Sequence, residues 1–308
     1  MRGLTLRGFG NGPRGVGTAG YDPRVTDQQP LPADLRALFA DGAASRVLSV
    51  PLPPGRAVRS EEEVGDRPAF WFSDGSAPEG LWARLRAEHA RSGLWPLLLD
   101  ALDDDAAEYR PWGSGEVCPG AMSAPGGHDA AAVLAGWWAE HTGIGDNGDD
   151  DLSPAERAAV TAPYGRDWPG PAPAPAARVD ADRAADDLAE HVLDGHPSMR
   201  LGLVAAERGA DAVAVAGWTG PANYTEDTAE LSAVLRDWED RFGARVVAVG
   251  FDTLLLSVAA PPATLAEALV VAAEHFAFCP DNVWQDTETL TAYAERLVDD
   301  HSWAFWWD

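Results

Sequence analysis

The fold class follows from one stretch of sequence, residues 226–259, which reads EDTAELSAVLRDWEDRFGARVVAVGFDTLLLSVA. Its first half predicts an amphipathic helix over residues 226–242, because large apolar residues recur there at steps of three and four. Its second half predicts a β-hairpin, since the short apolar runs 245–250 and 254–259 are joined by only three residues. Strands that are almost continuously apolar are buried on both faces, so helices must cover both sides of this sheet.

The rest of the C-terminal half supplies partners for the hairpin. We expect helices over residues 182–194, over 264–279 after a Thr-Leu-Ala-Glu capping box, and over 290–298. We expect strands over 212–218, a run of small and β-branched residues, and over 303–307. The order strand, helix, hairpin, helix, helix, strand predicts an α+β fold in which helices pack on a mixed β-sheet.

The N-terminal half shows fewer clear elements. Residues 80–92 predict a helix that ends at Gly93, and residues 94–99 then form a short apolar run typical of a buried strand. Pro96 should confine this strand to a sheet edge, or lie at the start of the strand, because proline cannot donate a backbone hydrogen bond. A further helix is expected from Asp129, which can cap it, to about residue 143.

The composition suggests boundaries along the chain. Residues 1–30 are rich in Gly, Pro and Arg without apolar periodicity, which is typical of a flexible N-terminal extension. Residues 169–179 are rich in Pro and Ala and predict a stiff linker. The linker would separate an N-terminal α/β half, residues 31–168, from a C-terminal α+β half, residues 180–308.

Charge and composition exclude several classes of protein. The chain of 308 residues is 46% hydrophobic and has a net charge of −26, and every one of its basic residues is Arg. The lack of Lys excludes a phosphate-binding P-loop and a Schiff-base enzyme, and the negative charge disfavours nucleic acid. We find no secretory signal and no apolar stretch of the roughly 20 residues that span a membrane, so we expect a soluble, cytoplasmic protein. The sequence leaves the oligomeric state open.

The sharpest candidate site surrounds His275 and Cys279, which stand four residues apart at a predicted helix end, so their side chains can meet on one face. A thiol beside an imidazole is the minimum for a thiolate nucleophile, and Asp281 would orient the ring in a thiol-dependent hydrolase or transferase. The neighbouring Phe276 and Phe278 favour instead a buried thiol with a structural role. A third interpretation makes His275 and Cys279 metal ligands, completed by Asp281 or another histidine.

Two other stretches are candidates for binding. Trp218, Asn223 and Tyr224 lie just before a predicted helix N-terminus, where backbone N–H groups can bind an anion, although Gly220 and Pro221 fit an ordinary turn equally well. The closing strand places aromatic residues on both faces, so it is either a central strand of the sheet or an aromatic docking surface for a protein.

Residues 146–151, DNGDDD, form the densest acidic run. A calcium loop with Gly148 at its sixth position would need a carboxylate at position 143, which is Gly143, so we interpret the run as a solvated loop. The Gly-rich phosphate loop, the Gly-x-Ser-x-Gly elbow and the His-Glu-x-x-His pattern are missing from the sequence, and we expect no cofactor.

Several blocks resemble the bacterial family called domain of unknown function 4253. The blocks are GLWARLRAEH at 80–89, SGLWPLLL at 92–99, WEDRFG at 238–243, AEHFAFCPDN at 273–282 and WAFWWD at 303–308. The resemblance covers most of the chain from about residue 31 and implies one extended domain, without implying a mechanism.

The charge, the 13 Trp residues and the lack of a complete catalytic set lead us to expect a non-enzymatic binding protein that neutralises or chaperones a basic protein partner.

Overall fold

A seven-stranded mixed sheet forms the centre of the protein. The computed structural model describes residues 29–41, 43, 45–61, 67–102, 108–143 and 153–308. Within them the strand order is β3-β4-β6-β5-β7-β8-β9, all neighbours antiparallel except β5 and β7. The strands are β3 (Gly55–Val58), β4 (Phe70–Ser76), β5 (Trp95–Leu99), β6 (Arg200–Val204), β7 (Arg245–Val249), β8 (Thr253–Ser257) and β9 (Ser302–Trp306), while β1 (Gln29–Pro30) and β2 (Val47–Leu48) pair separately.

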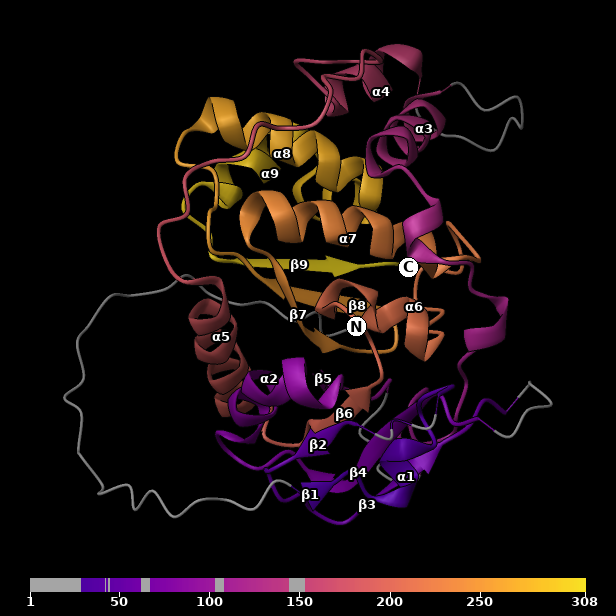
Figure 1. Cartoon of the computed structure of the whole chain (residues 1–308). Coiled ribbons are helices and arrows are strands. Elements are labelled where there is room, and N and C mark those ends of the chain that lie inside the picture. The colour runs from indigo at the N-terminus through magenta and orange to yellow at the C-terminus, as the bar shows by residue number, and fades with distance from the viewer. Residues whose placement is uncertain (1–28, 42, 44, 62–66, 103–107, 144–152) are drawn as a thin grey trace.

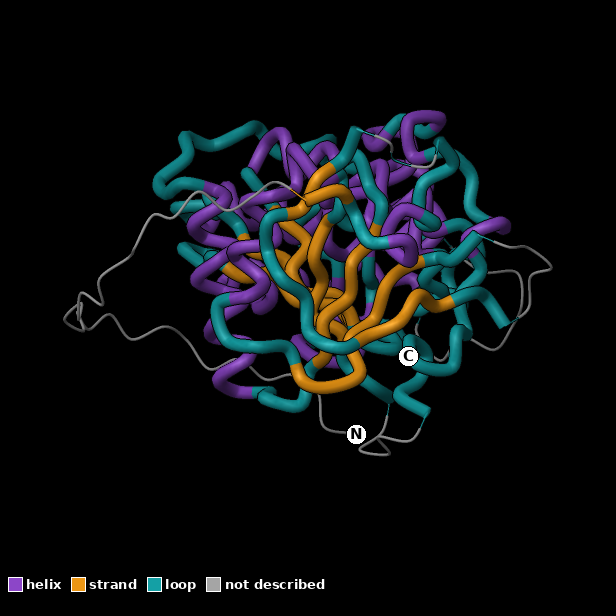
Figure 2. The backbone as a smooth tube through the Cα atoms, turned by 60° about the horizontal axis from the view of Figure 1, so that its bottom comes forward, coloured by secondary structure: helices purple, strands orange, loops and turns teal. Residues whose placement is uncertain are grey.

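Helices surround this sheet, as Figure 2 shows. In Figure 1, α7 (Thr228–Phe242), α8 (Leu265–Phe278) and α9 (Leu290–Leu297) lie on one side of β9, and α2 (Leu81–Ser92) and α5 (Ala181–Gly195) lie on the other. The remaining helical elements are α1 (Ala33–Arg36), α3 (Ala130–Thr142), α4 (Pro154–Val160), α6 (Ala212–Ala216), the short η1 (Pro119–Ala121), η2 (Pro125–Gly127) and η3 (Gly209–Asp211), and the π-helical η4 (Asn282–Thr287). The predicted α+β class is confirmed. None of the described helices is long and apolar enough to cross a membrane.

Local chemistry sets the helix ends where the sequence predicts them. Asp227 caps α7 by accepting from the Ala229 N–H, and the helix ends at Gly243, whose φ of 61° suits glycine. Thr264 and Glu267 form the expected capping box of α8. The apolar stripe of α7 is buried, from Leu231 to Phe242, which confirms the amphipathic pattern.

One predicted strand is wrong. Residues 212–218 form helix α6 and a turn at Gly217, whose φ is 72°, and the strand of this region is β6, just before them. A short run of small apolar residues fits a buried helix as well as a strand, because both hide such residues completely. The sequence of β6 does not show the pattern of a typical strand, because Gly202 lies in its middle. The Leu99 side chain approaches the backbone at this glycine.

Strand β5 lies inside the sheet, between β6 and β7, rather than at an edge. Pro96 is the second residue of the strand, so the other predicted alternative, a position at the strand start, is the correct one. The parallel pairing with β7 begins only at Leu98, beyond the proline. Before that point the indole of Trp95 donates to the Val246 carbonyl at 3.0 Å and takes the place of a backbone hydrogen bond.

Strand β9 is an edge strand, so the expectation of a central strand is wrong. It pairs with β8 alone. Trp303, Phe305 and Trp307 are nevertheless 1–2% exposed and pack toward α7 and α8, with Phe305 stacked on Trp238 at 5.6 Å between ring centres. The alternate residue Ala304 is exposed and Trp306 is half-buried, as the alternation predicts.

Strands from both sides of the expected linker share the sheet, since β3, β4 and β5 precede residue 169 and β6 to β9 follow residue 179. The segment 169–179 contains no helix or strand, and its Ala172 is buried. Its N–H donates to the fully buried carboxylate of Glu274 at 2.5 Å, and its carbonyl accepts from Arg241 at 2.8 Å. Arg241 also pairs with Glu274 at 2.6 Å, so this segment is fixed to α7 and α8 by a buried ion pair.

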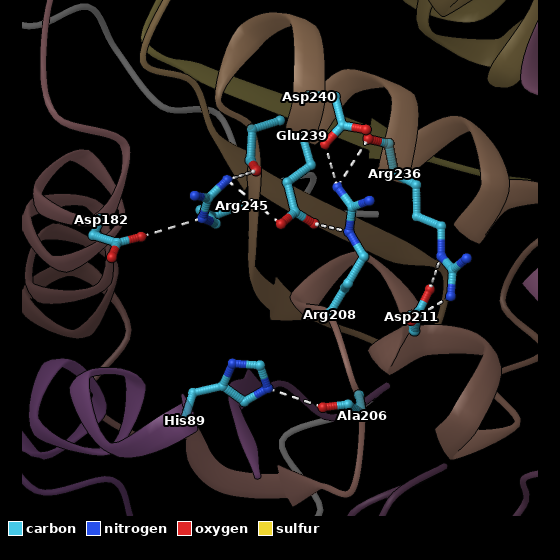
Figure 3. A network of polar contacts seen from close by, with 10 residues as sticks. His89, Asp182, Ala206, Arg208, Asp211, Arg236, Glu239, Asp240 and Arg245 are labelled. Carbon is cyan, nitrogen blue, oxygen red and sulfur yellow. Dashed lines mark hydrogen bonds and ion pairs between the residues drawn. The ribbon is translucent and has the colours of Figure 1, made fainter. Parts of the chain in front are cut away.

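A second set of ion pairs lies on and beside α7 (Figure 3). Arg245 of β7 lies 3.3 Å from Asp182 of α5, and Arg236 of α7 lies 2.5 Å from Asp211. Arg208 lies 3.5 Å from Glu239. The arginines of this region are therefore neutralised by carboxylates of the same chain. The acidic run 146–151 lies outside the described residues.

Candidate functional site

The residues around Cys279 form a clamp on the free edge of β9. The Cys279 thiol donates to the Trp306 carbonyl at 2.9 Å, and Asn282 Nδ2 donates to the Ala304 carbonyl at 2.7 Å. The Asp308 N–H donates to Asp281 Oδ2 at 3.1 Å. We call Cys279, Asp281 and Asn282 the edge clamp. Its side chains satisfy backbone groups that an additional strand would otherwise bind, which protects the edge from pairing with another chain.

Cys279 itself is completely buried. Burial raises the pKa of its thiol well above the ordinary value, and the Asp281 carboxylate adds to this effect. A nucleophilic cysteine needs the opposite, a lowered pKa and access to solvent. The geometry therefore supports the structural interpretation of Cys279, that of a small buried group that donates one hydrogen bond.

His275 is also completely buried, and the described hydrogen bond of its ring is to Tyr293 rather than to Cys279. Its Nδ1 lies 3.0 Å from the Tyr293 hydroxyl, which accepts from Asn282 Nδ2 at 3.0 Å. We assign the hydroxyl proton to this Nδ1, which leaves the imidazole proton on Nε2. That nitrogen has no hydrogen-bond partner among the described residues, and the ring meets Trp303 edge-on at 4.4 Å between centres. Burial holds the pKa of His275 well below its usual range, so the ring stays neutral.

Asp281 does not orient His275, contrary to the expectation for a catalytic triad. Its Oδ1 accepts from the Tyr224 hydroxyl at 2.8 Å and from Gln285 Nε2 at 2.9 Å, while Oδ2 binds the Asp308 N–H. The hydrogen bond from Tyr224 to Asp281 therefore connects the two candidate sites of the sequence analysis, the one around Cys279 and the one that contains Tyr224. Burial and the adjacent Asp281 raise the pKa of the Tyr224 hydroxyl.

The other predicted binding residues also hold the end of β9 and the turn beside it. Asn223 Nδ2 donates to the Asp308 carbonyl at 2.7 Å. The Trp218 indole donates to the carbonyls of Gly250 and Phe251, both at 3.0 Å, in the turn between β7 and β8. At the α7 N-terminus, where the sequence suggests an anion site, the Thr228 and Ala229 N–H groups are bound by Met122 Sδ and by Asp227. This chain's own side chains therefore fill that position.

Three aspartates follow strand ends at one end of the sheet. Strands β5, β7 and β9 run in the same direction, and their carboxyl ends lead into Asp100, Asp252 and Asp308. Burial and the neighbouring Asp308 raise the pKa of Asp252. Phe251 and Trp306 are partly exposed nearby in the chain. We call Phe251, Asp252, Trp306 and Asp308 the carboxyl-end site.

Comparison with known families gives one match. Residues 200–308 match the model of a domain of unknown function, DUF4253. These residues belong to the DUF4253 family. No curated protein and no solved structure matches the chain.

The DUF4253 match begins at the first residue of β6 and includes every side chain of the edge clamp and of the carboxyl-end site. It leaves out β5, which lies between two strands of the matched region. The two most distinctive sequence blocks, AEHFAFCPDN and WAFWWD, are direct partners in the edge clamp.

The described residues contain no cluster of side chains suited to bind a metal ion. In the part of the chain that the structure describes, no three His, Cys, Asp or Glu side chains are grouped so that they could hold one.

The sequence analysis did not single out Asp252, although a carboxylate just after a buried strand is a recognisable signal for a site at the strand ends.

Proposed function

We propose that this protein is a cytoplasmic, non-enzymatic binding module, which takes a basic segment of a protein partner at the carboxyl-end site. The observation that carries the proposal is the pair Asp252 and Asp308. Neither carboxylate has an ion-pair partner among the described residues. The pKa of Asp252 is raised by burial and, to a smaller extent, by repulsion from Asp308. A cation between them would remove that repulsion.

The surroundings of the two carboxylates suit an arginine or lysine side chain. Phe251 and Trp306 are partly exposed, and aromatic faces attract cations, as the Arg110 guanidinium over the Phe251 ring at 5.8 Å illustrates. Aromatic residues are also enriched in protein interfaces. In sheets with parallel strands, ligands bind beyond the carboxyl ends, which is where these residues lie.

The net charge of the chain supports the same proposal. At −26 the protein attracts basic partners over a distance and speeds their association at low salt. The arginines described above are paired within the chain, so they do little to offset this field at the carboxyl-end site.

Binding of an arginine-rich peptide, measured by fluorescence anisotropy at low salt, tests the proposal. The double variant Asp252→Asn/Asp308→Asn should weaken binding by at least about ten-fold, which corresponds to about 1.4 kcal/mol. The matched control is Glu190→Gln/Asp194→Asn, which removes two exposed carboxylates from α5 and the same total charge. Equal loss in both variants would show attraction by net charge alone and would overturn the proposed site.

A further inference from the structure

We propose that Met122 is a site of reversible oxidation, at which a peroxide converts the thioether to a sulfoxide and changes how residues 118–128 dock on α7. Among the described methionines, Met199 is 1% exposed and lies in the core, whereas Met122 is partly exposed. The Met122 sulfur is in contact with two polar donors of one residue. It accepts from the Thr228 hydroxyl at 2.8 Å and from the Thr228 N–H at 3.2 Å.

Those two donors belong to the first residue of a 15-residue helix. The loop that carries Met122 is held there by a small polar cluster around the helix cap: the Ser123 N–H donates to Asp227 at 3.1 Å, and His128 lies 3.7 Å from Asp227. A thioether sulfur is a weak acceptor, yet it occupies the positive end of a helix, where a stronger acceptor would be more stable.

Oxidation supplies that stronger acceptor. One oxygen atom passes from the peroxide to sulfur: the O–O bond breaks, an S–O bond forms, sulfur loses two electrons and the peroxide leaves as water or an alcohol. The new oxygen can bind the donors of Thr228, but the present sulfur-to-donor distances leave no space for it. The loop must therefore retreat by roughly the length of one S–O bond while the helix keeps an acceptor at its N-terminus.

Oxidation of Met122 should also affect Trp218, which lies in the DUF4253 region. The Thr228 hydroxyl also lies 2.9 Å from the Trp218 carbonyl, so the sulfur and this carbonyl compete for one proton. A sulfoxide oxygen would take that proton from Trp218, whose indole holds the turn between β7 and β8.

Graded hydrogen peroxide on the folded protein, followed by peptide mass mapping, tests the inference. Met122 should gain one oxygen at least about ten-fold faster than Met199, because oxidation follows exposure, and methionine sulfoxide reductase should remove it. In the oxidised protein, amide hydrogen exchange should rise over residues 118–128, while the Thr228 amide stays protected.

Two variants serve as controls. Met199→Leu should leave the oxygen uptake of the folded protein unchanged, and Met122→Leu should abolish the change in hydrogen exchange. Equal oxidation of both methionines, or exchange over residues 118–128 that does not respond to oxidation, would overturn the inference. The mass mapping of the unaltered protein decides the selectivity even if a variant fails to fold.

Discussion

Cys279 is a chemically suggestive residue whose described contacts are structural. Its thiol donates to the Trp306 carbonyl inside the edge clamp, and burial raises its pKa. We therefore expect iodoacetamide to label Cys279 only after denaturant is added, whereas Cys118, which is partly exposed, is labelled in the native protein. Rapid native labelling of Cys279 near neutral pH would restore the thiol-enzyme hypothesis.

The variant Cys279→Ala should lower the free energy of unfolding by about 1–3 kcal/mol, because it leaves the partly buried Trp306 carbonyl without its donor. Chemical denaturation measures this difference. Cys279→Ser is the matched control, since it retains a donor, and it should cost less than the alanine variant.

His141 of α3 is a buried residue whose protonation should lower the stability of the protein. Its ring meets Tyr224, Phe276 and Trp284 at 5.7–6.1 Å between centres, and burial lowers its pKa from 6.5 to about 4. The Ala277 carbonyl and Asp281 oppose this shift, and Arg157 adds to it. The unfolded chain therefore binds a proton at this residue before the folded one does, as the pH falls below about 6.5.

The consequence is a stability that is complete above pH 6.5 and falls as the pH drops toward 4. At about 1.4 kcal/mol for each pH unit, the loss from this residue amounts to about 3 kcal/mol. Denaturation at several pH values measures the slope, and the variant His141→Gln should flatten it between pH 6.5 and 4. An unchanged slope in the variant would contradict the assigned pKa.

The course of the chain after Cys279 explains why the site could not be predicted in full. His275, Cys279 and Asp281 are close in sequence, which suggests a common site, and they do lie in one region of the structure. After Cys279 the chain turns into a π-helix, and Asp281 is directed to Tyr224 and Asp308, partners that lie 57 and 27 positions away. No local pattern encodes contacts of that range.

Strand β9 is the element whose contribution is most directly testable. Three rings of the segment 303–308, two in the strand and Trp307 just after it, are buried, at roughly 1.5–3 kcal/mol each, against a net stability of about 5–15 kcal/mol for a typical domain. Deleting residues 303–308 should therefore unfold the protein or make it insoluble, as thermal denaturation and size-exclusion chromatography would show. A truncated protein that stays monomeric with an unchanged melting temperature would make the segment a docking tail.

Point variants separate the two faces of this strand. Phe305→Ala should cost about 3–5 kcal/mol, because Phe305 is 1% exposed and stacks on Trp238. Trp306→Ala, on the half-buried face, should cost less and should instead weaken the binding of basic peptides.

Elements with a strong period or a cap were predictable from the sequence, and those decided by their neighbours were not. Helices α7 and α8 follow from their stripes and caps. The place of β5 in the sheet depends on an indole that substitutes for a missing backbone donor, and the small residues of α6 give no period by which to choose helix over strand.

At the scale of the molecule, the shared sheet predicts that neither half of the chain is stable by itself. Without β6 and β7, strand β5 would lose both of its neighbours. We expect fragments 31–168 and 180–308, expressed separately, to lack a cooperative thermal transition, and co-expression to restore one. A cooperative transition in either fragment alone would favour the division into two domains at residues 169–179.

The contact between Trp95 and Val246 joins positions 151 residues apart, and this has a consequence for how the protein reaches its native state. Closing so long a loop costs entropy before the contact is gained, so the centre of the sheet should form late and limit the folding rate. During synthesis the apolar strand β5 leaves the ribosome well before either of its neighbours. Until they arrive it is a segment open to misassociation, and the yield of folded protein should depend on how quickly translation supplies them.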